Sequence, residues 1–203
     1  MRRIIFAAAI LALALGGAAT PQPALAQEAP AEAQIFALDP AHTQVGFSID
    51  RFGFNYVLGR FDTLSGEVRL DQANPENSSV TATIQTASLS AGHDLRNEHL
   101  RGERWLDAAQ FQTIEFRSTS VQRTGENSAD VTGDLTLHGL THPVTLAVTL
   151  NKLGPNPATQ APAAGFSATA VLSRAQFGIT AAENLIGDEV RITIEVLSVA
   201  AAE

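Results

Sequence analysis

The sequence contains no cysteine among its 203 residues. This absence excludes disulfides, thiolate nucleophiles, CxxC redox pairs, and zinc or iron–sulfur sites built on cysteine. Cations are also scarce, because 13 Lys and Arg residues stand against 21 Asp and Glu residues and give a formal net charge of −8. We therefore expect neither nucleic acid nor an anionic membrane surface to be a partner of this chain.

Motifs of known catalytic geometry are missing as well. The sequence has no GxSxG elbow, HExxH pair, P-loop or GxGxxG fingerprint. His138 and His142 are four residues apart, but a glycine and a proline beside them indicate a turn rather than one face of a helix. We expect no enzyme, no cofactor and no metal. The alternative of a metal-dependent hydrolase requires His93, His99 and a carboxylate to converge on one ion.

A long apolar run occurs at the N-terminus, where Arg2 and Arg3 precede the stretch from Ile4 to Leu15. That stretch is shorter than the roughly 20 residues that span a bilayer. The Ala-Leu-Ala sequence ending at Ala26 has the form that signal peptidase cleaves. We therefore predict that residues 1–26 are a signal peptide cleaved after Ala26, which indicates export to a periplasm and no stable membrane insertion.

Residues 27–34 are small, polar and proline-bearing, and this composition predicts a disordered spacer. A single folded domain is then expected over residues 35–203. Within it, apolar and polar residues alternate in eight runs separated by turn-forming residues. The runs cover residues 44–50, 59–71, 80–85, 114–117, 131–137, 144–150, 166–172 and 190–196.

The strict alternation predicts an all-β fold of antiparallel strands, each with one apolar face. Residues 90–109 break this period and contain helix-forming residues, so we expect one or two short helices between strands 3 and 4, with Ser90 as the N-cap. Closure into an eight-stranded β-barrel is favoured over a sandwich because it removes exposed edges. The interior of such a barrel is either filled by side chains or holds one slender ligand.

Five short segments, in order along the chain, resemble landmarks of the YceI-like family. They are Asp39-Pro40-Ala41-His42-Thr43 with Val45-x-Phe47, Phe52-Gly53-Phe54 leading to Gly59-Arg60-Phe61, His99-Leu100 with Trp105-Leu106-Asp107, the run from Gly133 to Thr141, and Arg174-x-x-Phe177-Gly178-Ile179. The resemblance implies an exported, lipocalin-like barrel that binds a polyisoprenoid.

The function that we expect is a periplasmic carrier that holds an isoprenoid or similar long apolar lipid, such as a polyprenyl chain, an isoprenoid quinone or a fatty amide. The alternative is a stress-related interaction protein whose barrel is filled by side chains and takes no lipid. Small inward-facing residues, such as Ala82, Gly133, Ala168 and Ala170, would leave volume for a ligand. The sequence leaves a homodimer open.

The candidate site residues fall into two groups. Those expected to line the cavity are Phe47, Phe52, Phe54, Tyr56, Phe61, Ile84, Leu100, Trp105, Phe116, Leu135, Phe166 and Phe177. Those expected to bind a polar head group are His42, Arg51, Arg60, His99 and Arg174. Arginine suits a diphosphate, whereas histidine or Tyr56 suits a quinone, and the sequence does not distinguish these heads.

Overall fold

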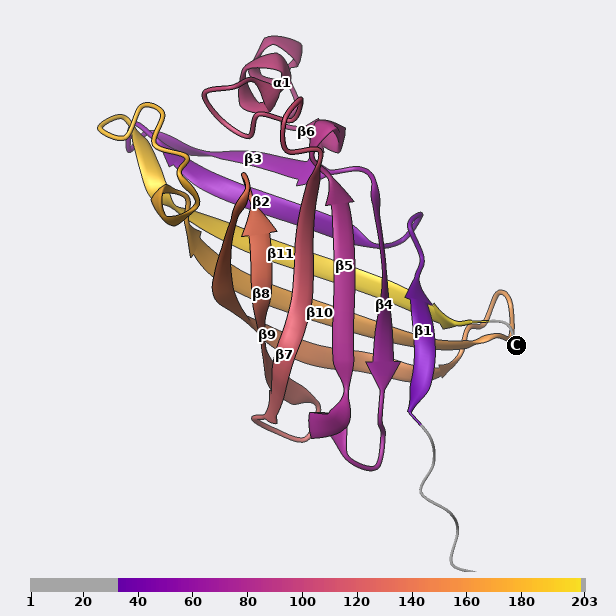
Figure 1. The fold of residues 1–203 in the computed structure, drawn as a ribbon. Coiled ribbons are helices and arrows are strands. Elements are labelled where there is room, and N and C mark those ends of the chain that lie inside the picture. The colour runs from indigo at the N-terminus through magenta and orange to yellow at the C-terminus, as the bar shows by residue number, and fades with distance from the viewer. Residues whose placement is uncertain (1–32, 202–203) are drawn as a thin grey trace, which may run out of the picture.

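A computed structural model describes residues 33–201, and in this part of the chain nearly all regular structure is β-strand (Figure 1). The strands are β1 (Gln34–Leu38), β2 (Gln44–Arg51), β3 (Asn55–Phe61), β4 (Leu64–Leu70), β5 (Ser79–Gln85), β6 (Leu89–Ser90), β7 (Thr113–Arg123), β8 (Ser128–Leu137), β9 (Leu140–Pro155), β10 (Pro162–Ser173) and β11 (Ile186–Ala200). The helical elements of the same part are α1 (Asp94–Arg101) and the 3-10 turns η1 (Pro75–Asn77), η2 (Thr86–Ser88) and η3 (Ala175–Phe177).

These strands form one antiparallel sheet in the order β1-β4-β5-β7-β8-β9-β10-β11-β2-β3-β6, and a further pairing of β1 with β11 closes it. Both β1 and β2 pair with β11, one after the other along its length. Each of the pairs β1/β2, β3/β4 and β5/β6 is therefore one interrupted strand. The predicted closed barrel of eight antiparallel strands is confirmed.

One of the interruptions corrects an expected strand. Residues 59–71 do not form one straight strand, because β3 ends at Phe61 and β4 begins at Leu64. At this break Asp62 N donates to Ser88 O at 3.2 Å, and Gln85 N donates to Thr63 O at 3.0 Å. The chain bends there, so that β3 pairs with β2 while β4 pairs with β1.

The helical segment lies over one end of the barrel, above β6 and the start of β7 (Figure 1). A short helix between the third and fourth barrel strands is confirmed by α1, but Ser90 is not its N-cap. Ser90 still pairs with Arg60 in the sheet, and His93 occupies the N-cap position without a capping side-chain bond. The sheet pairing holds Ser90 in extended conformation, and the helix therefore begins at Asp94.

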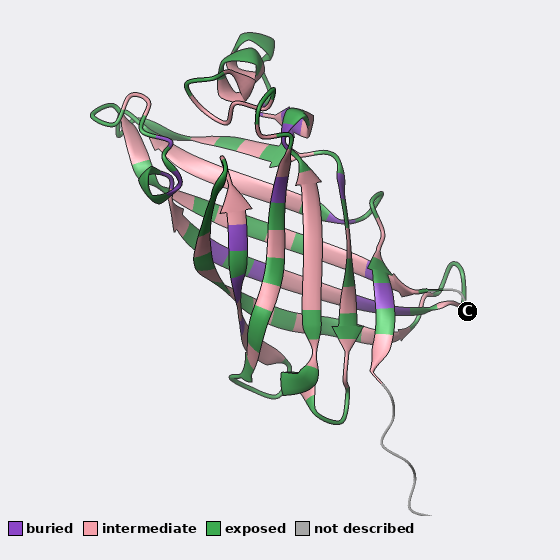
Figure 2. Ribbon diagram, in the orientation of Figure 1, coloured by how far each residue is buried: buried purple, intermediate pink, exposed green. Residues whose placement is uncertain are grey.

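The barrel wall alternates as expected, but its inward side chains are seldom fully buried. Along β9, exposed residues alternate with partly accessible ones, and no residue is buried (Figure 2). A packed core is found at the end below α1, around Ile114, Leu135 and Phe177. Many inward residues elsewhere, such as those of β9, keep accessible surface because they face a hollow space, although Val131, Ala168 and Ala170 are buried.

The predicted signal peptide, residues 1–26, lies outside the described residues, as does most of the predicted spacer, residues 27–34. The first strand begins at Gln34, one residue before the domain start expected at Ile35. Within residues 33–201, no helix is both long enough and apolar enough to cross a membrane.

Candidate functional site

The barrel encloses a cavity of about 890 Å³. At one end the cavity is bounded by the helical insert, including Leu95 and Trp105, and at the other by the turns that carry Gln72 and Glu126. Between these ends the lining consists of the apolar side chains that alternate along the strands. The volume falls within the range of small-molecule sites, roughly 300–1,000 Å³.

Two aromatic rings of the lining have their tips beside glycines of the neighbouring strand. Gly59 pairs with Phe47, and a Cβ built at Gly59 would lie 2.2 Å from Cζ of that ring. A Cβ at Gly133 would likewise lie 2.5 Å from Cζ of Phe116. The missing side chains let both rings rest on the wall instead of pointing across the lumen. Glycine at these two positions therefore keeps the interior open.

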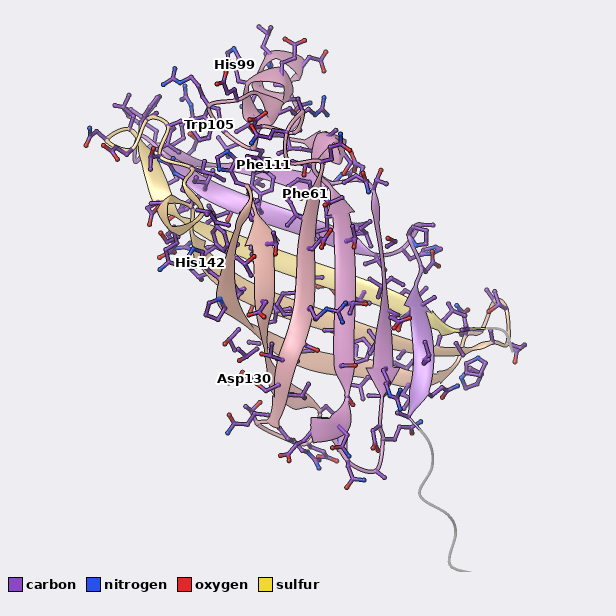
Figure 3. The ribbon with its side chains drawn as sticks, in the orientation of Figure 1. Phe61, His99, Trp105, Phe111, Asp130 and His142 are labelled. Carbon is purple, nitrogen blue, oxygen red and sulfur yellow. The ribbon has the colours of Figure 1, made fainter. Side chains whose placement is uncertain are left out.

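Most of the residues expected to line the cavity do line it. Those that do are Phe47, Phe61, Ile84, Leu100, Trp105, Phe116, Leu135, Phe166 and Phe177. In Figure 3, Phe61, Phe111 and Trp105 lie between the barrel end and the helix that carries His99. Ala82, Ala168 and Ala170 also line the cavity, whereas Gly133 acts by admitting the ring of Phe116.

Phe52, Phe54 and Tyr56 do not line the cavity, contrary to the expectation from sequence. Their exposed fractions are 43%, 88% and 48%. The segment between β2 and β3 is a three-residue hairpin loop, residues 52–54, with Phe52 and Gly53 at positive φ and Phe54 N donating to Arg51 O at 3.1 Å. Such a tight turn continues the two strands and directs these rings outward.

The head-group candidates separate into two sets. Arg51, His99 and Arg174 line the cavity, whereas His42 and Arg60 do not. His42 lies 2.7 Å from a carboxylate oxygen of Asp39, and this hydrogen bond lowers the pKa of that carboxyl group. Arg60 is paired with Asp62 at 2.7 Å on the outer surface.

Arg174 is 5% exposed and serves first to hold the loop between β10 and β11. Its guanidinium donates to main-chain oxygens at 2.8–3.0 Å, those of Ile179, Ala181, Ile186 and Gly187. The guanidinium carbon also lies 5.4 Å from the ring centre of Trp105, which ties this loop to the helical insert. Burial lowers the pKa of Arg174, while the charges of Asp188 and Glu183 oppose that shift.

A second group of contacts packs η3 against the hairpin between β8 and β9. His138 Nδ1 lies 3.1 Å from Phe177 O, and the ring of His142 meets that of Phe177 edge-on at 5.2 Å. Phe111 contacts His138 in the same manner at 4.6 Å. His138 and His142 thus have packing roles where the β8–β9 hairpin meets η3.

The cavity lining also contains residues that were not among the sequence candidates. Some of these are aliphatic residues of the regular strands, such as Val148 and Ile192, and the alternation alone was enough to identify them. His93, Leu95 and Arg96 also line the cavity, but no periodic pattern in so short a helix indicates which side meets the barrel. In the described part of the chain, no group of three or more His, Asp or Glu residues is placed to hold a metal ion.

Residues 36–197 match the family model described as YceI-like domain. The chain belongs to the YceI-like family. A UPF0312 protein of Pseudomonas savastanoi pv. phaseolicola is 38% identical over 170 residues, which cover 84% of this chain and 86% of that relative. One from Pseudomonas putida (strain W619) is 41% identical over 138 residues, covering 68% and 71%.

Several solved structures share the fold. BcnA of Burkholderia cenocepacia aligns with a TM-score of 0.72 and 26% identity, over 79% of this chain and 98% of BcnA. The YceI protein of Campylobacter jejuni aligns with a TM-score of 0.66 and 25% identity, over 82% and 97%. A polyisoprenoid-binding domain from Saccharophagus degradans has a TM-score of 0.61 and 17% identity, over 84% and 100%.

Proposed function

We propose that this YceI-like protein binds one long apolar lipid, an isoprenoid or a similar chain, inside its barrel and carries it through the periplasm. The observation that carries the proposal is the continuous apolar cavity of about 890 Å³. Burial of a chain in such a space contributes about 0.8 kcal/mol per CH₂ group, so a long tail would bind firmly without strong polar contacts.

The hollow interior favours this function over a side-chain-filled barrel that acts only through its surface. In a filled barrel the inward residues of β9 would be fully buried, whereas they remain partly accessible. The description of the Saccharophagus degradans domain as polyisoprenoid-binding supports the same class of ligand. The predicted signal peptide supports a periplasmic location, and the lack of a catalytic motif supports binding rather than catalysis.

The test is to identify what the protein holds and what it takes up. Mature protein is purified from a membrane-containing host and examined by native mass spectrometry, and delipidated protein is then titrated with prenyl alcohols. We expect one copurified lipid molecule per barrel in the native mass spectrum and saturable uptake of prenyl alcohol by the delipidated protein. An empty protein that takes up no prenyl alcohol or quinone would contradict the proposal.

A matched pair of variants on β10 tests whether the lipid binds inside the barrel. Ala168 lines the cavity, whereas its neighbour Thr169 faces outward. Ala168→Phe should fill part of the lumen and abolish most uptake, and Thr169→Phe adds the same ring on the outer surface and should bind normally. Equal binding by the two variants would locate the ligand elsewhere.

A further inference from the structure

The charged groups that line the cavity are distributed unevenly between its two ends. At the end beneath α1 every titratable lining residue is an arginine or a histidine; these are Arg51, His93, Arg96, His99 and Arg174. The one carboxylate in the lining, that of Glu126, lies at the opposite end, where it is accompanied by Arg123. This concentration of positive charge occurs in a chain whose formal net charge is −8.

We call these five residues the rim of the cavity at its α1 end, and several of them are held by contacts with neighbouring elements. Arg51 is the sheet partner of Ile186, and Arg174 donates to the main-chain oxygen of that same residue at 3.0 Å. Arg174 in turn lies beside Trp105 of the helical insert. Arg96 of α1 is fixed by two hydrogen bonds to Ala91 O, at 3.1 and 2.6 Å.

None of the ion pairs found within residues 33–201 neutralises these arginines. Arg51 is exposed, and its guanidinium rests 4.3 Å from the centre of the Phe52 ring without a hydrogen bond to the described residues. Arg96 engages the main chain through Nε and Nη2, which leaves Nη1 free to donate. The rim therefore offers guanidinium donors that protein acceptors do not use.

The acidic residues near this rim in the sequence do not line the cavity, and these include Asp50, which directly precedes Arg51 and accepts a hydrogen bond from Gly53 N at 3.0 Å. Asp94 and Glu98 lie on α1 and are exposed, as are Glu183 and Asp188 on the loop that Arg174 holds. Asp188 is occupied as an acceptor for Ala175 N at 2.8 Å. The cavity lining at this end thus presents guanidinium and imidazole groups and no carboxylate.

We infer that the α1 end of the cavity binds a negatively charged head group, such as a phosphate ester, while the apolar tail extends into the barrel. The inference rests on the proposed function and names the class of amphiphile that it would carry. Guanidinium groups suit this task because their planar donors form paired, charge-assisted hydrogen bonds with phosphate or carboxylate oxygens. A neutral alcohol or quinone would leave the positive charges without a partner.

The experiment compares two probes with the same tail, geranylgeraniol and geranylgeranyl monophosphate, by titration of delipidated protein. We expect the phosphate to bind the wild-type protein at least about tenfold more tightly, because guanidinium donors form charge-assisted hydrogen bonds with the phosphate that the neutral alcohol does not offer. Added salt should reduce this preference, since it screens the exposed charges.

Arg51→Gln should remove most of the preference for the phosphate and leave the affinity for the alcohol unchanged. Arg60→Gln is the matched control, because Arg60 lies on the neighbouring strand, is paired with Asp62 and does not line the cavity. It should change neither affinity. Arg96→Gln provides a second test, and thermal unfolding of each variant confirms that it is folded.

Equal binding of the two probes by the wild-type protein would overturn the head-group inference and leave the proposed function standing. An Arg51→Gln variant and an Arg96→Gln variant that both keep the full phosphate preference would also overturn it. If neither probe binds, the proposed function fails, and the inference fails with it.

Discussion

The contact between Gly59 and the ring of Phe47 offers a direct test of how the lumen stays open. A Cβ at position 59 would lie 2.2 Å from Cζ and 2.6 Å from Cε1 of that ring. Carbon atoms that are not bonded to each other need about 3.5–4.0 Å, so Gly59→Ala must move the tip of the ring by about 1 Å or more. The wall blocks movement outward, and the ring therefore turns into the lumen.

The substitution should separate binding from stability. The ring moves into empty space, and alanine in a strand is favoured over glycine by roughly 0.5–1 kcal/mol, so the free energy of unfolding should change by less than about 1 kcal/mol. A ring that displaces about two methylene groups of a bound chain removes about 1.6 kcal/mol of burial, roughly a fifteenfold loss of affinity.

The assay is urea unfolding of delipidated protein together with titration of a prenyl alcohol. Gly46→Ala is the control on β2, because a Cβ there meets only main-chain oxygens at 3.6 and 3.7 Å, which is ordinary contact. Gly133→Ala should instead destabilise the protein by about 1–3 kcal/mol, since its Cβ would lie 2.5 Å from the main-chain oxygen of Arg117. A folded Gly59→Ala variant with wild-type affinity would refute the reasoning.

Further predictions concern the loop and the exposed hairpin. Arg174→Lys should lower the free energy of unfolding by about 2 kcal/mol in urea titrations, because buried main-chain oxygens lose their donors. A hydrogen bond from the Ser173 side chain is the main cause that lowers the pKa of Asp188, so the ionised carboxylate stabilises the fold at pH values above its ordinary pKa of 3.8. The wild type should therefore be more stable than Asp188→Asn at neutral pH. This difference in unfolding free energy should shrink as the pH falls below 3.8. Phe54→Ser should change stability by less than about 0.5 kcal/mol in thermal unfolding, since the ring is 88% exposed.

The barrel was predictable because successive side chains in a strand point to opposite faces of the sheet, so alternating apolar and polar residues identify a strand with one buried face. In β8, for example, Val131 and Leu135 are buried while Asp134 between them is exposed, as a period of two requires. The expected turn at His138 and Gly139 is also present, with both residues at positive φ between β8 and β9. Local patterns of this kind depend only on neighbouring residues.

Features that depend on distant contacts were not predictable in the same way. The outward direction of Phe54 follows from a turn formed by Phe52 at positive φ, a conformation that bulky residues rarely adopt. The structural role of Arg174 depends on main-chain oxygens up to 13 residues away. The position of Arg96 on the cavity depends on how a short helix rests on the barrel, which its sequence does not encode locally.

Two parts of the interior contribute differently to stability. Near the end below α1, Ile114, Leu135 and Phe177 form a packed cluster that supports the barrel without a ligand. Farther along, residues such as Phe166 and Ala168 face open space, and a void forfeits the contacts that a packed core would supply. A bound chain would restore those contacts, so the lumen contributes to stability only when it is filled. Substitutions in the packed cluster should therefore lower the stability of the delipidated protein, whereas those along the hollow wall should act chiefly on the lipid-bound form.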